Sequence, residues 1–134
     1  IVGDGLQAAQ LKKQAKKNIE FLGLVSDKKL KEIYARARAF IFPQEEDFGI
    51  AVLEAMSSGR PVIAFKAGGV LETVKEGITG LFFKEQTPES LIEALRKFKP
   101  SDFDSKIIRQ HALQFDEEAF KEKIREFVAL QIKI

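Results

Sequence analysis

The sequence predicts an α/β domain of the doubly wound class, in which helices cover both faces of a parallel sheet. Short apolar segments alternate with amphipathic segments along the chain, as strands and helices alternate in that class. The short segments are apolar at nearly every position, which is typical of parallel strands buried on both faces. The length of 134 residues, without an internal repeat or linker, predicts one domain over residues 1–134.

Five apolar segments are expected to form the strands, and three of them end directly at a glycine or proline. Ile1-Val2 leads into the tight turn Gly3-Asp4-Gly5, Gly23 closes the second strand, and Pro43 stops the third. The expected strands are residues 1–2, 19–22, 39–42, 61–65 and 80–83.

The segments between and after the strands have the periodicity of amphipathic helices. Ser26-Asp27 can cap the second helix, while Thr87 and Pro88 can open the fifth. The last stretch, about residues 115–134, is expected to be a helical tail with an apolar stripe. The expected helices are residues 6–17, the segment from Ser26 to Ala37, and residues 50–58, 71–75, 88–98, 102–114 and 116–132.

Composition excludes several kinds of chemistry. The chain has no cysteine and one histidine, so it offers no thiol nucleophile, cysteine zinc site or paired-histidine mechanism. No run of about 18 apolar residues is long enough to span a membrane, and the lack of cysteine fits the cytoplasm. Basic residues predominate only in residues 1–38, nine against four acidic ones, without interleaved aromatics, so we expect no nucleic-acid partner.

The most informative stretch is Phe42–Ala64, in which a strand, an acidic loop, a helix and another strand follow one another. Residues 50–56 are apolar nearly all round, which predicts a buried helix. Glu54 is the one charged residue in that helix, and a buried carboxylate needs a partner or a ligand. The free N–H groups of Phe48, Gly49 and Ile50 at the helix start could bind phosphate oxygens.

The two carboxylates in this stretch could complete a ligand site. Glu54 suits a vicinal diol, since each carboxylate oxygen can accept one hydroxyl proton, and Glu46 could hold further sugar hydroxyls. Gly49 would let the ligand approach the backbone closely. Structural roles are the alternatives: Glu46 as an acid before a helix start, and Glu54 as the partner of a basic side chain.

Seven residues separate Glu46 from Glu54, with Phe48-Gly49 after the first glutamate and Glu-Ala-Met around the second. This ordered set resembles the family 4 (group 1) retaining glycosyltransferases of GT-B fold, over about residues 1–130. The further matching segments are Gly3–Gly5, Phe21–Val25, Gly59–Ala64, Gly68-Gly69 with Glu72, Gly77 and Thr79-Gly80.

The resemblance implies a nucleotide-sugar donor site in the C-terminal half of a GT-B fold. Glu46 would contact the donor sugar and is the candidate catalytic residue, and Glu54 would bind the ribose hydroxyls. The amides of Phe48, Gly49 and Ile50 would meet the diphosphate, while Val25 and Asp27 would border the nucleobase. Such enzymes retain the anomeric configuration, and the resemblance implies neither a cofactor nor a metal.

The family also has an arginine–lysine pair and an acceptor-binding domain ahead of the Gly3–Gly5 turn. We therefore expect a chain truncated at its N-terminal side, which binds the donor but is inactive alone. The motifs look most like mannosyltransferases of polysaccharide assembly, which favours GDP-mannose, with a UDP-sugar as the alternative donor. An epimerase domain of GT-B fold and a non-catalytic protein-binding module are alternative functions.

The location of the acceptor is a separate expectation. The Lys12-Lys13 and Lys16-Lys17 pairs could help to dock an acceptor at the inner face of the membrane. The alternative, which the charge pattern favours, is a solvated helix face.

Overall fold

The computed structural model describes residues 1–132, so the last two residues of the expected domain and tail lie outside the described part. The chain forms two compact units, Ile1–Ile33 and Tyr34–Ile134. Each unit is described by itself below.

The first unit has two short segments that run parallel to each other. Val2 forms a parallel bridge with Gly23, the Leu22 N–H donates to the Ile1 carbonyl at 2.9 Å, and the Gly3 N–H donates to the Gly23 carbonyl at 2.8 Å. The strands expected at residues 1–2 and 19–22 are thus paired, but the pairing is limited to an isolated bridge.

The helices of the first unit are close to expectation. Helix α1 (Ala8–Gln14) is shorter than the expected range of residues 6–17. Helix α2 (Asp27–Arg36) begins in this unit and ends in the second. The Ser26 hydroxyl oxygen accepts from the Lys29 N–H at 3.3 Å, so the predicted cap is confirmed.

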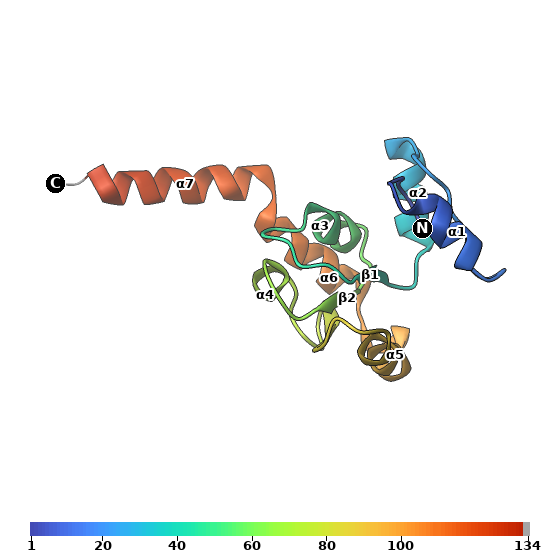
Figure 1. Cartoon of the computed structure of the whole chain (residues 1–134). Coiled ribbons are helices and arrows are strands. Elements are labelled where there is room, and N and C mark those ends of the chain that lie inside the picture. The colour runs from blue at the N-terminus through green and yellow to red at the C-terminus, as the bar shows by residue number, and fades with distance from the viewer. Residues whose placement is uncertain (133–134) are drawn as a thin grey trace. The chain divides into compact units, whose positions relative to one another are not determined.

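The second unit is built on a parallel sheet whose strands lie in chain order, β1 (Phe40–Phe42), β2 (Val62–Phe65) and β3 (Gly80–Phe83). Ile41 pairs with Ile63, which pairs with Leu81. Figure 1 shows α3 (Ile50–Ser57) on one side of the strands and α5 (Pro88–Lys97) on the other. The predicted α/β class, with a parallel sheet between helices, is confirmed.

Alternating side chains divide the core between the two sides of the sheet. Ile63 and Phe83 pack with Ala94 of α5 in one buried cluster. Successive side chains of a strand point to opposite faces, so Val62 and Ala64, which are fully buried, face the side of α3. The α3 side chains that are buried are Val52, Ala55 and Met56.

Two further helices, α4 (Val70–Thr73) and α6 (Ser105–Ala112), contact α3. Helix α4 follows β2, and α6 packs against α3. The Arg109 guanidinium donates to the Ser57 carbonyl at 3.1 Å, and buried His111 contacts the Thr73 carbonyl through Nε2 at 2.8 Å. The single histidine of the chain therefore serves in packing.

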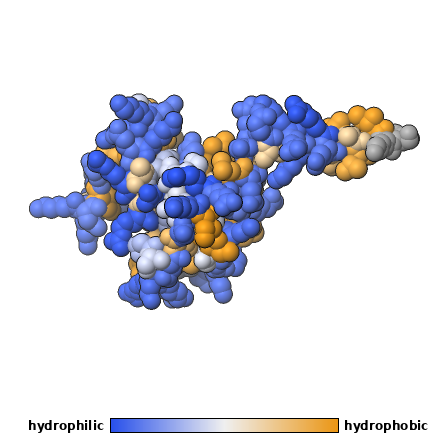
Figure 2. All heavy atoms as spheres, turned by 180° about the vertical axis from the view of Figure 1, so that it is seen from behind, coloured by the Kyte–Doolittle hydropathy of each residue, from blue (hydrophilic) through white to orange (hydrophobic). Residues whose placement is uncertain are grey.

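The chain ends in 3₁₀ turns and an exposed helix: η1 (Pro100–Asp102), η2 (Leu113–Phe115) and α7 (Glu117–Ile132). Helix α7 confirms the expected amphipathic tail, yet none of its described side chains is buried. Figure 2 shows hydrophobic side chains on the surface near the end of this helix. Over residues 1–132, no helix combines the length and the hydrophobicity needed to cross a bilayer.

Candidate functional site

The loop between β1 and α3 lies at the carboxyl ends of the parallel strands, where doubly wound folds bind their ligands. It contains Glu46, and the Glu46 carbonyl accepts from the N–H of Gly69 at 2.7 Å. Gly69 belongs to the loop that follows the neighbouring strand β2. The fold therefore joins the two loops directly and fixes the backbone on which Glu46 sits.

Helix α3 begins without a side-chain cap. Its N-cap is Gly49, and no side chain accepts a hydrogen bond there. Ile50 and Ala51 lie in the first turn, where N–H groups have no intrahelical acceptor, and Val52 donates to the Gly49 carbonyl at 3.0 Å. Among the backbone hydrogen bonds of the described residues, none is donated by the N–H of Phe48 or Gly49. The helix start therefore offers free donors and its positive dipole end to an anion.

The backbone conformation of Gly49 gives a further reason for a glycine at this position. Its backbone is left-handed, with φ 77° and ψ 62°, a region that other residues avoid. An added Cβ would lie 3.4 Å from Val52 and 3.5 Å from the ring of Phe42, so that side of the glycine faces the core. Gly49 thus provides the left-handed turn into α3, and its role in close approach of a ligand stays a prediction.

Glu46 is exposed, and its side chain forms a hydrogen bond with a neighbouring side chain. The Gln44 amide nitrogen donates to Oε1 of Glu46. The adjacent Glu45 and Asp47 are exposed as well, so the loop presents acidic side chains just before the helix start. Such a carboxylate can accept hydrogen bonds from sugar hydroxyls, while the amides of the helix start serve an anionic group.

The position of Glu54 corrects the expectation of a buried helix. Only one face of α3 is covered, Glu54 is exposed, and Ile50 is 66% exposed on the same side. The partner of the Glu54 carboxylate is the hydroxyl of Tyr34, which donates to Oε2 at 3.2 Å, and not a basic side chain. The pKa of Tyr34 is raised to about 12, first by burial of the phenol and then by the charge of Glu54 and its hydrogen bond.

An open pocket of about 330 Å³ lies along the exposed face of α3. Its lining brings together Phe48, Ile50 and Glu54 from the predicted set with side chains of η2, while Glu46 does not line it. The remaining lining residues are Leu53, Ser57, Ala112, Leu113, Phe115 and Asp116. Three of the predicted residues therefore border one hollow beside the helix start.

The two residues predicted to border the nucleobase belong to the first unit. Val25 is half-buried in the segment after Gly23, and Asp27 is the exposed first residue of α2. The site at the start of α3 is built from the second unit alone. A role for Val25 and Asp27 in base binding stays a prediction.

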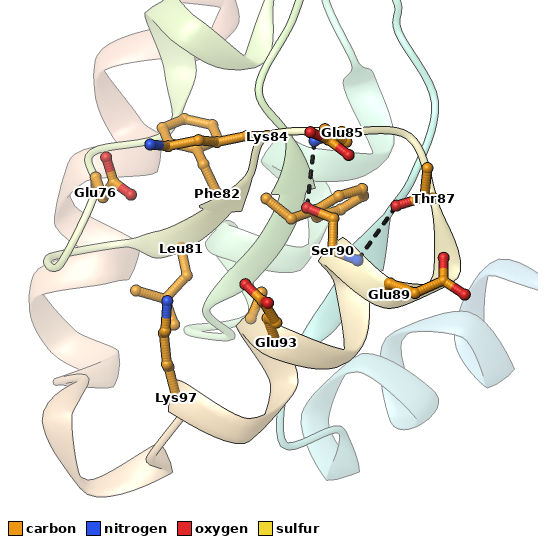
Figure 3. A pocket seen from close by; sticks show the side chains of 12 residues that line it. Glu76, Leu81, Phe82, Lys84, Glu85, Thr87, Glu89, Ser90, Glu93 and Lys97 are labelled. Carbon is orange, nitrogen blue, oxygen red and sulfur yellow. Dashed lines mark hydrogen bonds between the residues drawn. The ribbon is translucent and has the colours of Figure 1, made fainter.

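Figure 3 shows another pocket, of about 430 Å³, between β3 and α5. Its rim includes Glu89, Glu93 and Lys97 of α5, and the Thr87 hydroxyl oxygen accepts from the Ser90 N–H at 3.3 Å. The latter contact confirms the predicted cap of α5. None of the residues predicted to bind the donor lines this pocket.

Two basic residues that follow the motif in sequence, Arg60 and Lys66, have partners of their own. Arg60 donates to the carbonyls of Ser58 and Ala37 at 3.3 and 3.4 Å, and the Lys66 ammonium lies 3.3 Å from a carboxylate oxygen of Glu76. Neither residue lines the pocket beside α3.

Sequence reasoning missed Tyr34 as the partner of Glu54. The two residues are twenty positions apart, and the sequence shows Tyr34 only as one apolar-face residue of an amphipathic helix. Tyr34 is the single tyrosine of the chain, but this fact does not indicate which residue its hydroxyl contacts.

Together, these features describe a doubly wound α/β domain in which an uncapped helix start lies at the carboxyl ends of the parallel strands. Residues 1–122 match the family model described as glycosyl transferases group 1. The chain belongs to this family, and the resemblance stated from its motifs is confirmed.

Relatives of known name are longer than this chain. A sulfoquinovosyl transferase of Arabidopsis thaliana is 34% identical over 113 residues, 78% of this chain and 22% of that protein. A GDP-mannose-dependent alpha-mannosyltransferase of Corynebacterium glutamicum is 38% identical over 94 residues, 66% of this chain and 22% of that protein. The chain thus spans about a fifth of the length of these relatives.

The fold is shared with a solved structure. HepE of Anabaena, solved in complex with UDP-glucose, aligns with a TM-score of 0.74 and 26% identity. The alignment covers 96% of this chain and 39% of that chain.

Proposed function

We propose that the chain is the nucleotide-sugar donor-binding domain of a retaining glycosyltransferase, with its site at the start of α3. The observation that carries the proposal is the combination found there. An uncapped helix start lies between two exposed carboxylates, Glu46 before the helix and Glu54 just past its first turn. Amide donors suit a diphosphate, and carboxylate acceptors suit the hydroxyl groups of the ribose and of the sugar.

Each part of a donor has a counterpart in this arrangement. The N–H groups of Phe48, Gly49 and Ile50 would bind the diphosphate, and Glu54 would accept from the ribose hydroxyls. Glu46 would accept from hydroxyls of the transferred sugar and orient it for reaction. The hydrogen bond from the Gln44 amide supports that role, because a carboxylate that is already ordered loses less conformational entropy when a ligand binds.

The proposed reaction is a front-face substitution. The bond between the sugar carbon and the diphosphate oxygen breaks while the acceptor oxygen attacks that carbon from the same face, so the configuration is retained. The acceptor's proton passes to the departing diphosphate. The positive end of α3 would stabilise the negative charge that builds up on the diphosphate, because fixed dipoles aimed at developing charge lower the barrier.

The proposed donor is GDP-mannose, with a UDP-sugar as the second candidate. The printed name of the Corynebacterium glutamicum relative supports the first, and the HepE complex with UDP-glucose supports the second. Both donors share a ribose and a diphosphate. Those shared groups are the ones that the second unit would bind.

Transfer itself is proposed for a longer polypeptide in which an acceptor-binding domain accompanies this one. The chain spans only about a fifth of its curated relatives. We expect the 134-residue chain to bind a donor without transferring its sugar.

Isothermal calorimetry on the wild-type chain tests the binding proposal. GDP, UDP, GDP-mannose and UDP-glucose are expected to bind, and guanosine and uridine to bind at least about tenfold more weakly, because the helix start contacts only the diphosphate. Affinity is expected to be the same with magnesium and with a chelator. Equal binding of nucleoside and diphosphate, or no binding at all, would contradict the proposal.

A further inference from the structure

The hydroxyl of Tyr34 lies against the carboxylate of Glu54. The distance is 3.2 Å to Oε2 of Glu54, and 3.4 Å to the carbonyl oxygen of Ala51. A hydroxyl has one proton to donate, and the carboxylate is both the nearer and the stronger acceptor. The charge-assisted bond therefore joins α2 to α3 through two side chains.

The tyrosine ring is itself held firmly. Tyr34 is 8% exposed, and its ring meets Phe40 edge-on, with centroids 5.7 Å apart. The hydroxyl is thus a fixed donor aimed at the surface of α3. An aromatic side chain has only two rotatable angles, and packing on Phe40 restricts both.

Glu54, in contrast, is exposed and depends on Tyr34 for its position. Among the hydrogen bonds and ion pairs of residues 1–132, no other side chain contacts its carboxylate. An exposed glutamate without such a contact samples several rotamers, and ordering it on binding costs free energy. A fixed donor removes part of that cost in advance.

We infer that Tyr34 is a positioning residue, which holds Oε2 of Glu54 so that the carboxylate meets the two hydroxyls of a ribose in a fixed orientation. The inference rests on the proposed function, because it needs Glu54 to bind ribose. A carboxylate has about four acceptor positions, and Tyr34 occupies one of them, so enough remain for a vicinal diol. Tyr34 thereby sets the preference for ribose over deoxyribose.

Tyr34→Phe removes the donor and keeps the ring that packs on Phe40. Calorimetry with GDP, UDP and their 2′-deoxy counterparts measures the effect. We expect ribonucleotide affinity to fall by about two- to tenfold, as for the loss of one pre-ordered side chain. The 2′-deoxy nucleotides, which use Glu54 less, should lose less affinity, so the ratio of the two affinities falls. A merely structural role would weaken both nucleotides equally.

A second measurement needs no nucleotide, because Tyr34 is the single tyrosine and the chain has no tryptophan. With ¹³C-labelled tyrosine, the chain gives one set of tyrosine ring signals. The signal of the carbon that bears the hydroxyl is expected to shift in Glu54→Gln at neutral pH, since the acceptor changes from a charged to a neutral group. Glu93→Gln, an exposed carboxylate lining the pocket beside α5, is the matched control and should leave it in place.

The outcomes separate this inference from the proposed function. If Glu54→Gln weakens nucleotide binding but Tyr34→Phe keeps the wild-type ratio of ribonucleotide to deoxynucleotide affinity, the positioning role is wrong and the proposed function stands. If the chemical shift of that tyrosine carbon is the same in Glu54→Gln as in the wild type, the inference is also overturned. If the wild-type chain binds no nucleotide, the proposed function fails, and the ribose role of Tyr34 fails with it.

Discussion

Replacing Glu54 by glutamine is expected to weaken the binding of GDP and UDP by roughly ten- to a hundredfold. The ribose hydroxyls would lose a charged acceptor, and hydrogen bonds to charged groups contribute about 1.5–3 kcal/mol. The variant keeps the shape of the side chain, and the amide oxygen can still accept from Tyr34. Titration calorimetry on the purified variant measures the loss.

Glu54→Gln is expected to fold as stably as the wild type, so a loss of nucleotide binding would not be due to unfolding. Glu54 is exposed, so the free energy of unfolding should change by less than about 1 kcal/mol. Glu93→Gln, which changes an exposed carboxylate at the pocket between β3 and α5, is the control and should bind nucleotide as the wild type does. If Glu93→Gln weakens binding and Glu54→Gln does not, the nucleotide binds in the other pocket and the site at α3 is wrong.

Gly69→Ala is expected to lower the free energy of unfolding by about 1–3 kcal/mol, as overpacking does. The backbone of Gly69 has φ −61° and ψ −18°, which alanine adopts freely, so conformation does not forbid the change. The added Cβ, however, would lie 2.2 Å from the carbonyl oxygen of Asp47. Because that oxygen is backbone, the loop before α3 has to move. Chemical denaturation measures the loss of stability.

Gly69→Ala should also weaken nucleotide binding, because the displaced loop contains Glu46 and leads into the helix start. Gly5→Ala is the control: it has no positive φ, and its Cβ would meet nothing within 4 Å. That substitution should change stability by no more than the small gain from a less flexible unfolded chain. A Gly69→Ala protein as stable as wild type would show that the two loops are not locked together.

The second unit could be predicted from the sequence nearly element by element. Apolar runs that end at Pro43 or lead to Gly68-Gly69 correspond to strands β1 and β2, and Thr87 caps α5. These signals are local, since they depend on side-chain periodicity and on residues that stop or start an element. The first unit was less predictable, because the extent of a strand depends on its partners, which a local pattern does not show.

The exposure of α3 and the partner of Glu54 could not be predicted. Residues 50–56 are apolar nearly all round, yet Ile50 is 66% exposed, because coverage depends on which elements pack nearby and not on composition. Tyr34 reaches Glu54 from a helix twenty positions earlier, a contact that only the fold creates. The motif spacing, by comparison, predicted two carboxylates at one helix start, because Glu46 and Glu54 belong to one continuous segment.

The central claim is that a nucleotide diphosphate binds at the start of α3, and amide chemical-shift mapping tests it most directly. On titration with GDP or UDP, the account predicts that the largest shifts occur at the N–H signals of residues 46–54, above all Phe48, Gly49 and Ile50. Signals of α5, beside the other pocket, should stay in place. Binding that shifts the α5 signals and leaves residues 46–54 unchanged would contradict the account.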